Sequence, residues 1–181
     1  MPDPFLCALS QTDTLPEVVR DLHSQPGRFT GRCSVERGQG VLVALALRLG
    51  GFPPSAQDIP VTVITQAMGA EWTWCRDFNG HHTRSRLTHD PRRGLVRERI
   101  GGLTIWMRTD LSSGRLSLEI KALSLFGCPC PRVLLPRSST VEWQDDQGRF
   151  RFDVSAQVPG LGRLIRYQGW LTRDHGNRGA D

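Results

Sequence analysis

The feature that most constrains the fold of this chain is a change of hydrophobic period at Pro60. From Pro60 to Leu171, apolar and polar residues alternate in short runs separated by turn residues. The strongest turn is Asn79-Gly80, because a tight hairpin needs positive φ at both central positions. The pattern predicts about ten sequential strands. They are Phe29–Arg37, Pro60–Ala67, Glu71–Phe78, His82–His89, Leu95–Ile100, Leu103–Thr109, Arg115–Leu125, Ser138–Gln144, Arg149–Val158 and Leu164–Leu171.

Sequential strands leave unpaired edges unless their sheet curls or closes. We therefore expect a mainly β fold, an antiparallel meander forming a closed or half-open barrel, with two short N-terminal helices. One helix follows Thr14, and the other spans Gly40 to Leu49 and is so apolar that it should be covered. Residues 14–173 are expected to form a single barrel-like domain, after an extension over 1–13 and before a disordered tail over 174–181.

Composition excludes several classes of protein. The longest apolar run, Val41–Leu47, is too short to span a membrane. The net charge is +5, but the arginines are scattered among acids, so nucleic-acid binding is not expected. The five cysteines are an odd number, which with an N-terminus lacking a basic signal region favours a cytoplasmic location. No metal-ligand spacing or phosphate-binding glycine motif occurs, so we expect no metal and no cofactor.

Alternation sorts the side chains of each strand between two faces. Trp72, Trp74, Arg76 and Phe78 share one face, and its aromatic content predicts that this face is inside. The same reasoning directs Glu98, Ile105, Phe152 and Tyr167 inward, and Ser85 if the Thr83–Leu87 face also points in. Three polar groups, Arg76, Glu98 and Tyr167, are thus predicted among apolar neighbours.

A buried charge must pair or line a wet cavity. One interpretation is an Arg76–Glu98 pair that fixes strand register in a filled core, with Tyr167 capping it. The other is a ligand cavity in which Arg76 clamps an anion or carbonyl and Glu98 acts as a base or hydrogen-bond acceptor. His23, on the first helix, is expected only to form a hydrogen bond at the helix end.

Spaced matches along the chain resemble the bacterial domain of unknown function 4166 family. They are Leu22-His23, Gly31, Gly38, Pro60-Val61, Trp74-x-Arg76-x-Phe78, Ser85, Glu98-Arg99-x-Gly101, Gly127, Pro131, Pro136, Gly148-Arg149-Phe150-x-Phe152-Asp153, Pro159, Gly162, Tyr167 and Gly169-Trp170-Leu171. The resemblance implies a cytoplasmic partner of oxidoreductases, since such domains often follow a dehydrogenase-like domain on one polypeptide.

These observations favour binding of a small hydrophobic metabolite in a barrel pocket, with acid/base conversion by isomerisation or cyclisation. The predicted catalytic residues are Arg76, Glu98 and Tyr167, and the predicted ligand-binding residues are Trp72, Trp74, Phe78, Ser85, Ile105 and Phe152. One alternative is a non-catalytic ligand carrier. The other is an accessory domain whose own core is filled and whose surface docks onto an oxidoreductase. Self-association as a homodimer is a further expectation.

Overall fold

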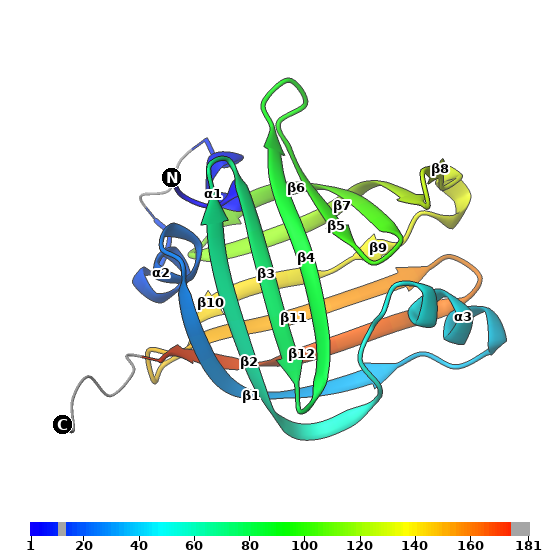
Figure 1. The fold of residues 1–181 in the computed structure, drawn as a ribbon, viewed down its shortest axis with the longest axis horizontal. Helices are drawn as coiled ribbons and strands as arrows, with labels where there is room; N and C mark the ends of the chain where they lie inside the picture. The colour runs from blue at the N-terminus through cyan, green and yellow to red at the C-terminus, as the bar shows by residue number, and fades with distance from the viewer. Residues whose placement is uncertain (11–13, 175–181) are drawn as a thin grey trace.

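The chain forms a closed antiparallel barrel of ten strands (Figure 1). The computed structural model describes residues 1–10 and 14–174, so most of the predicted tail and residues 11–13 lie outside the described residues. The barrel strands are β1 (Gly27–Arg37), β2 (Ala56–Met68), β3 (Glu71–Phe78), β4 (His81–Asp90), β5 (Leu95–Ile100), β6 (Leu103–Ser112), β7 (Arg115–Leu125), β10 (Thr140–Gln144), β11 (Phe150–Val158) and β12 (Gly162–Arg173).

Two pairings that join distant parts of the chain close the ring. β12 pairs with β1, placing Tyr167 opposite Val35, and β10 pairs with β7, placing Thr140 opposite Leu118. Closure gives the barrel strands neighbours on both sides, which removes the exposed edges that an open meander would present. The prediction of a barrel is confirmed, and the barrel is closed.

The predicted turns and inward faces are also confirmed. Asn79 and Gly80 adopt φ values of 52° and 94°, as a tight β3–β4 hairpin requires. On β3, Trp72 is fully buried and Phe78 is 5% exposed, while Ser85 on β4 is fully buried. The core of the protein is therefore the barrel interior.

The loop between β7 and β10 contains short elements that the periodicity did not predict. These are β8 (Cys128–Pro129) and the 3-10 helix η1 (Arg132–Leu134). The loop also contains β9 (Arg137–Ser138), so the predicted strand Ser138–Gln144 is divided between β9 and β10. Two-residue strands are too short for alternation to reveal.

The helices occupy opposite sides of the barrel. α1 (Pro4–Cys7) and α2 (Glu17–Ser24) lie together on one side, and α3 (Val41–Leu49) lies on the other (Figure 1). The two predicted helices are confirmed as α2 and α3, whereas α1 was not predicted. No helix in the described ranges is long and apolar enough to cross a membrane.

The expectation that the apolar helix is covered is wrong for its outer face. Val43 and Leu47 of α3 are buried, but Val41, Leu42 and Leu45 are 85%, 61% and 52% exposed. The helix contacts the barrel along one stripe only, so its remaining aliphatic residues face outward.

Candidate functional site

A polar cluster on three consecutive strands projects into the barrel interior. Trp74 of β3 pairs with Ser85 of β4. Leu87, which lies two residues after Ser85 and on the same face of β4, pairs with Glu98 of β5. This register brings Arg76 within hydrogen-bonding distance of both polar side chains. Its Nη1 donates to Ser85 Oγ at 2.9 Å, and its Nη2 lies 3.4 Å from Glu98 Oε1.

The ion pair between Arg76 and Glu98 is largely buried, and the distance between its charged atoms is long. The two side chains are 16% and 13% exposed. Their 3.4 Å separation exceeds the ~2.7–2.9 Å typical of a charge-assisted hydrogen bond. The guanidinium carbon also lies 5.1 Å from the centre of the Trp74 ring. A guanidinium carries five N–H donors, so these contacts leave Arg76 with donors for a further acceptor.

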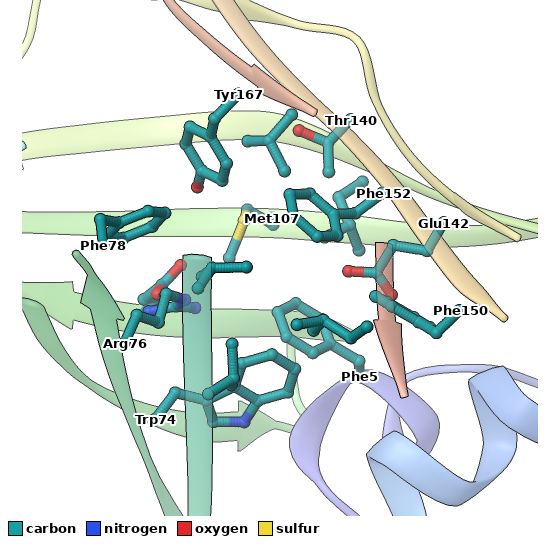
Figure 2. A pocket seen from close by; sticks show the side chains of 16 residues that line it. Phe5, Trp74, Arg76, Phe78, Met107, Thr140, Glu142, Phe150, Phe152 and Tyr167 are labelled. Atoms are coloured by element: carbon teal, nitrogen blue, oxygen red, sulfur yellow. The ribbon is translucent and has the colours of Figure 1, made fainter. Parts of the chain in front are cut away.

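Tyr167 reaches the cluster from the opposite wall. Its ring packs against Phe78 and Phe152, with centroid separations of 5.9 and 6.3 Å. Figure 2 shows its hydroxyl directed toward the side of the cavity that holds Arg76 and Phe78. Burial raises the pKa of Tyr167 to about 12, only partly opposed by the Arg76 charge, so the hydroxyl remains protonated and can donate a hydrogen bond.

The interior contains two adjoining cavities of about 100 Å³ each. Phe5 of α1 lines the first, and Phe52, which follows α3, lines the second. Arg76, Glu98 and Tyr167 line both. The polar cluster therefore lies where the two cavities meet.

One polar atom in the second cavity lacks a partner. Thr83 lines this cavity, and its buried Oγ1 forms no hydrogen bond with any described residue. A buried hydroxyl without a partner costs free energy unless water or a ligand satisfies it. Thr83 Oγ1 therefore keeps its hydrogen-bonding capacity unused beside the second cavity.

The structure brings most of the predicted site residues to these cavities. Trp74 and Phe152 line the first cavity, Ile105 lines the second, and Phe78 lines both. Ser85 lines neither but holds Arg76. Trp72 is fully buried and lines neither cavity, so it packs beside the site without reaching it.

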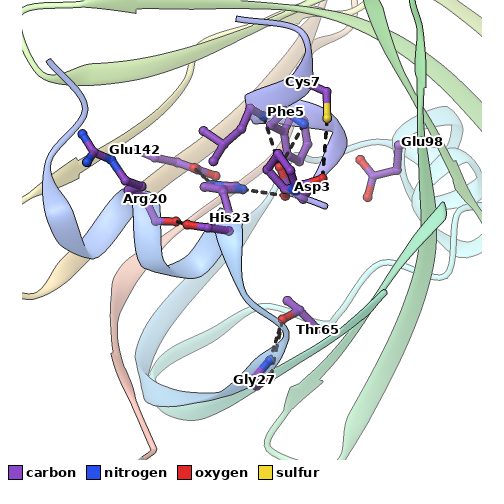
Figure 3. A network of polar contacts seen from close by, with 12 residues as sticks. Asp3, Phe5, Cys7, Arg20, His23, Gly27, Thr65, Glu98 and Glu142 are labelled. Atoms are coloured by element: carbon purple, nitrogen blue, oxygen red, sulfur yellow. Dashed lines mark hydrogen bonds and ion pairs between the residues drawn. The ribbon is translucent and has the colours of Figure 1, made fainter. Parts of the chain in front are cut away.

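Sequence reasoning missed a second polar network at the α1 end of the barrel. His23 Nδ1 lies 2.6 Å from Asp3 Oδ2, and His23 Nε2 lies 2.7 Å from Glu142 Oε2 (Figure 3). Asp3 also caps α1, accepting the backbone N–H of Phe5 at 2.9 Å. The side chains of Asp3 and His23 are fully buried, and that of Glu142 is 8% exposed.

The network shifts the pKa values of two of its members, His23 and Asp3. Burial alone would lower the pKa of His23, but Asp3 and Glu142 outweigh it and raise the pKa to about 10. Burial raises the pKa of Asp3, against the opposing effect of His23. Both shifts have the same sense, so the folded network holds protons more tightly than the unfolded chain. In the described residues, no group of His, Cys, Asp and Glu side chains is arranged to hold a metal ion.

Fold and site together define a closed antiparallel barrel with charged groups inside a mostly apolar interior. The chain belongs to the domain of unknown function 4166 family, whose model, DUF4166, matches residues 15–171. The predicted resemblance is confirmed. No curated protein matches the chain.

Proposed function

We propose that this protein binds a small, largely apolar molecule inside the barrel, holds its carbonyl or carboxylate oxygen at Arg76, and catalyses proton transfer on it. The observation that carries this proposal is the position of Arg76. Its guanidinium lines two apolar cavities with donors unused, beside a carboxylate and facing a phenol.

The cavities limit the size of the ligand. An engineered cavity of about 150 Å³ is known to hold benzene, so each space of about 100 Å³ suits a short chain or a small branched group. A longer molecule would occupy both spaces and pass Arg76 where they meet. Modest movement of side chains would admit a single ring.

The arrangement suits proton transfer beside a carbonyl group. Glu98, as a carboxylate, removes a proton from the carbon next to the carbonyl. Arg76 stabilises the negative charge that develops on oxygen, and Tyr167 donates a hydrogen bond to it. Return of the proton from Glu98 to a different carbon completes an isomerisation, with no net change in atoms or electrons.

Ligand binding is tested first, with thermal shift and native mass spectrometry on short alkanoates and apolar ketones. We expect a subset to raise the melting temperature of the wild type. Arg76→Met should lose that response, whereas Arg84→Met, at an exposed position on the neighbouring strand, should keep it. No response to any member of the series would contradict the binding proposal.

Proton transfer is tested by incubating binding-competent ketones in heavy water and following deuterium incorporation by NMR. The wild type should accelerate exchange next to the carbonyl. Glu98→Gln should abolish the acceleration and retain binding, while the exposed Glu119→Gln should match the wild type. Ligand binding without accelerated exchange would contradict the catalytic part of the proposal and indicate that the protein is a ligand carrier.

A second candidate function, docking onto an oxidoreductase or a second copy of this chain, is favoured by the exposed outer face of α3. Leu42 and Leu45 present aliphatic side chains to solvent on adjacent turns. Leu42→Glu with Leu45→Glu should leave the fold intact and reduce association measured by sedimentation. If the wild type already sediments as a monomer and the double variant gives the same profile, the homodimer is contradicted.

A further inference from the structure

Glu142 presents a carboxylate to the first cavity from the side opposite Arg76. Figure 2 shows Arg76 and Glu142 across the cavity from one another, with Met107 and Phe152 between them. Glu142 comes from β10, whereas Arg76 comes from β3. The cavity therefore has the Arg76–Glu98 pair on one side and the Glu142 carboxyl group on the other, with apolar walls between them.

Only one oxygen of this carboxylate is occupied. Oε2 contacts His23 Nε2 at 2.7 Å, whereas no hydrogen bond joins Oε1 to another residue in the described part of the chain. A carboxylate accepts several hydrogen bonds, and one that is nearly buried gains from each of them. Oε1 is thus a hydrogen-bond acceptor without a donor, and it belongs to a residue that lines a mostly apolar cavity.

The groups behind Glu142 fix its orientation. Because both ring nitrogens of His23 face carboxylate oxygens, two protons must lie in the two contacts. Asp3 is held in turn by the backbone N–H groups of Phe5 and Leu6, at 2.9 and 3.2 Å. The chain from α1 through α2 to β10 leaves Glu142 little freedom to rotate.

We propose that Glu142 Oε1 is a second polar contact of the ligand site and accepts a hydrogen bond from a hydroxyl or amino group of the ligand, with His23 and Asp3 as positioning residues. This inference rests on the proposed function, because it assumes that the cavity holds a ligand anchored at Arg76. It narrows the ligand class to small molecules with an oxygen acceptor at one end, an apolar middle and a hydrogen-bond donor at the other end.

The test compares butanoate, hexanoate and octanoate with the same acids carrying a terminal hydroxyl group. Binding is measured by isothermal titration, and the quantity of interest is the ratio of the two dissociation constants at matched chain length. A hydrogen bond to a charged acceptor is worth about 1.5–3 kcal/mol, so the wild type should prefer the hydroxylated acid of the best-fitting length by about tenfold or more.

Variants assign the preference to Glu142. Glu142→Leu should abolish the preference and retain affinity for the parent acid, while the exposed Glu119→Leu should keep both. Arg76→Met should weaken both members of each pair. His23→Gln should reduce the preference without weakening the parent acid, as expected of a positioning residue. Because each value is a ratio within one variant, a loss of stability does not affect it.

A measurement on the wild type keeps the test decisive if Glu142→Leu does not fold. The hydroxylated acid should shift the ring-nitrogen NMR signals of His23, whereas the parent acid should leave them in place. If the parent acids bind and the hydroxyl group gives neither a preference nor a His23 shift, this inference is overturned and the proposed function stands. If neither these acids nor the apolar ketones bind, the proposed function itself fails.

Discussion

His23 Nε2 lies 2.7 Å from Oε2 of Glu142, although 119 positions separate the two residues in sequence. The contact joins α2 to β10, the strand that closes the barrel against β7. One buried hydrogen bond thus couples the N-terminal helices to the closure of the barrel. The same bond holds the carboxylate that lines the first cavity.

Stability should fall as the pH rises from about 6.5 to about 10. The pKa of His23 is raised from its ordinary value of 6.5 to about 10, because Asp3 and Glu142 outweigh the opposing effect of burial. A group whose pKa is raised in the folded state contributes its full stability below the unfolded value and loses it as the pH passes through the folded one. Urea unfolding at a series of pH values will measure the slope.

His23→Gln provides the control for this pH dependence. Glutamine keeps hydrogen-bonding atoms but cannot take up the proton, so the variant should be less stable at neutral pH and show a flatter profile between these limits. A wild-type unfolding free energy that stays constant over the same range would contradict the protonated state of His23.

The Arg76–Glu98 pair should show strongly non-additive stability effects. Arg76→Leu leaves the Glu98 carboxylate, 13% exposed, without its cation, and Glu98→Leu leaves the guanidinium without its anion. Each change should cost about 3 kcal/mol, the lower limit for breaking a buried pair, because the two side chains keep 16% and 13% exposure. The double variant should recover most of that loss in chemical denaturation, whereas simple addition of the two costs would show that the pair is not coupled.

Alternation predicted the inward positions of Arg76, Glu98 and Tyr167 because long strands with aromatic neighbours make the two faces unequal. The inward position of Glu142 was not predicted, because β10 has only five residues and its inward face carries Thr140 and Glu142 with no large apolar side chain. The rule that places aromatic residues inside fails on this strand, because Trp143 lies on the outer face against the guanidinium groups of Arg115 and Arg151. Asp3 could not be found by periodicity, because its role depends on a helix of four residues packing at the end of the barrel.

Gly31→Ala should destabilise the barrel more than an ordinary surface substitution. A Cβ at this position of β1 would lie 1.8 Å from the backbone oxygen of Trp170 on β12, which real contacts do not permit. The two strands would have to separate at the pairing that closes the N-terminal and C-terminal parts of the barrel. We expect a loss of about 3 kcal/mol or failure to fold, measured against Thr30→Ala on the same strand.

The titration of Tyr167 provides a direct probe of the barrel interior, because the chain contains one tyrosine. Burial raises its pKa from 10.0 to about 12, although the Arg76 charge acts in the opposite direction. After a rapid jump to strongly alkaline pH, the near-ultraviolet absorbance of phenolate should therefore appear at the rate of unfolding and not within the mixing time. In Arg76→Met, removal of the nearby positive charge should raise the pKa further. Immediate ionisation at an ordinary pKa in the folded wild type would mean that the hydroxyl faces bulk water, and the proposed donor to the ligand oxygen would be lost.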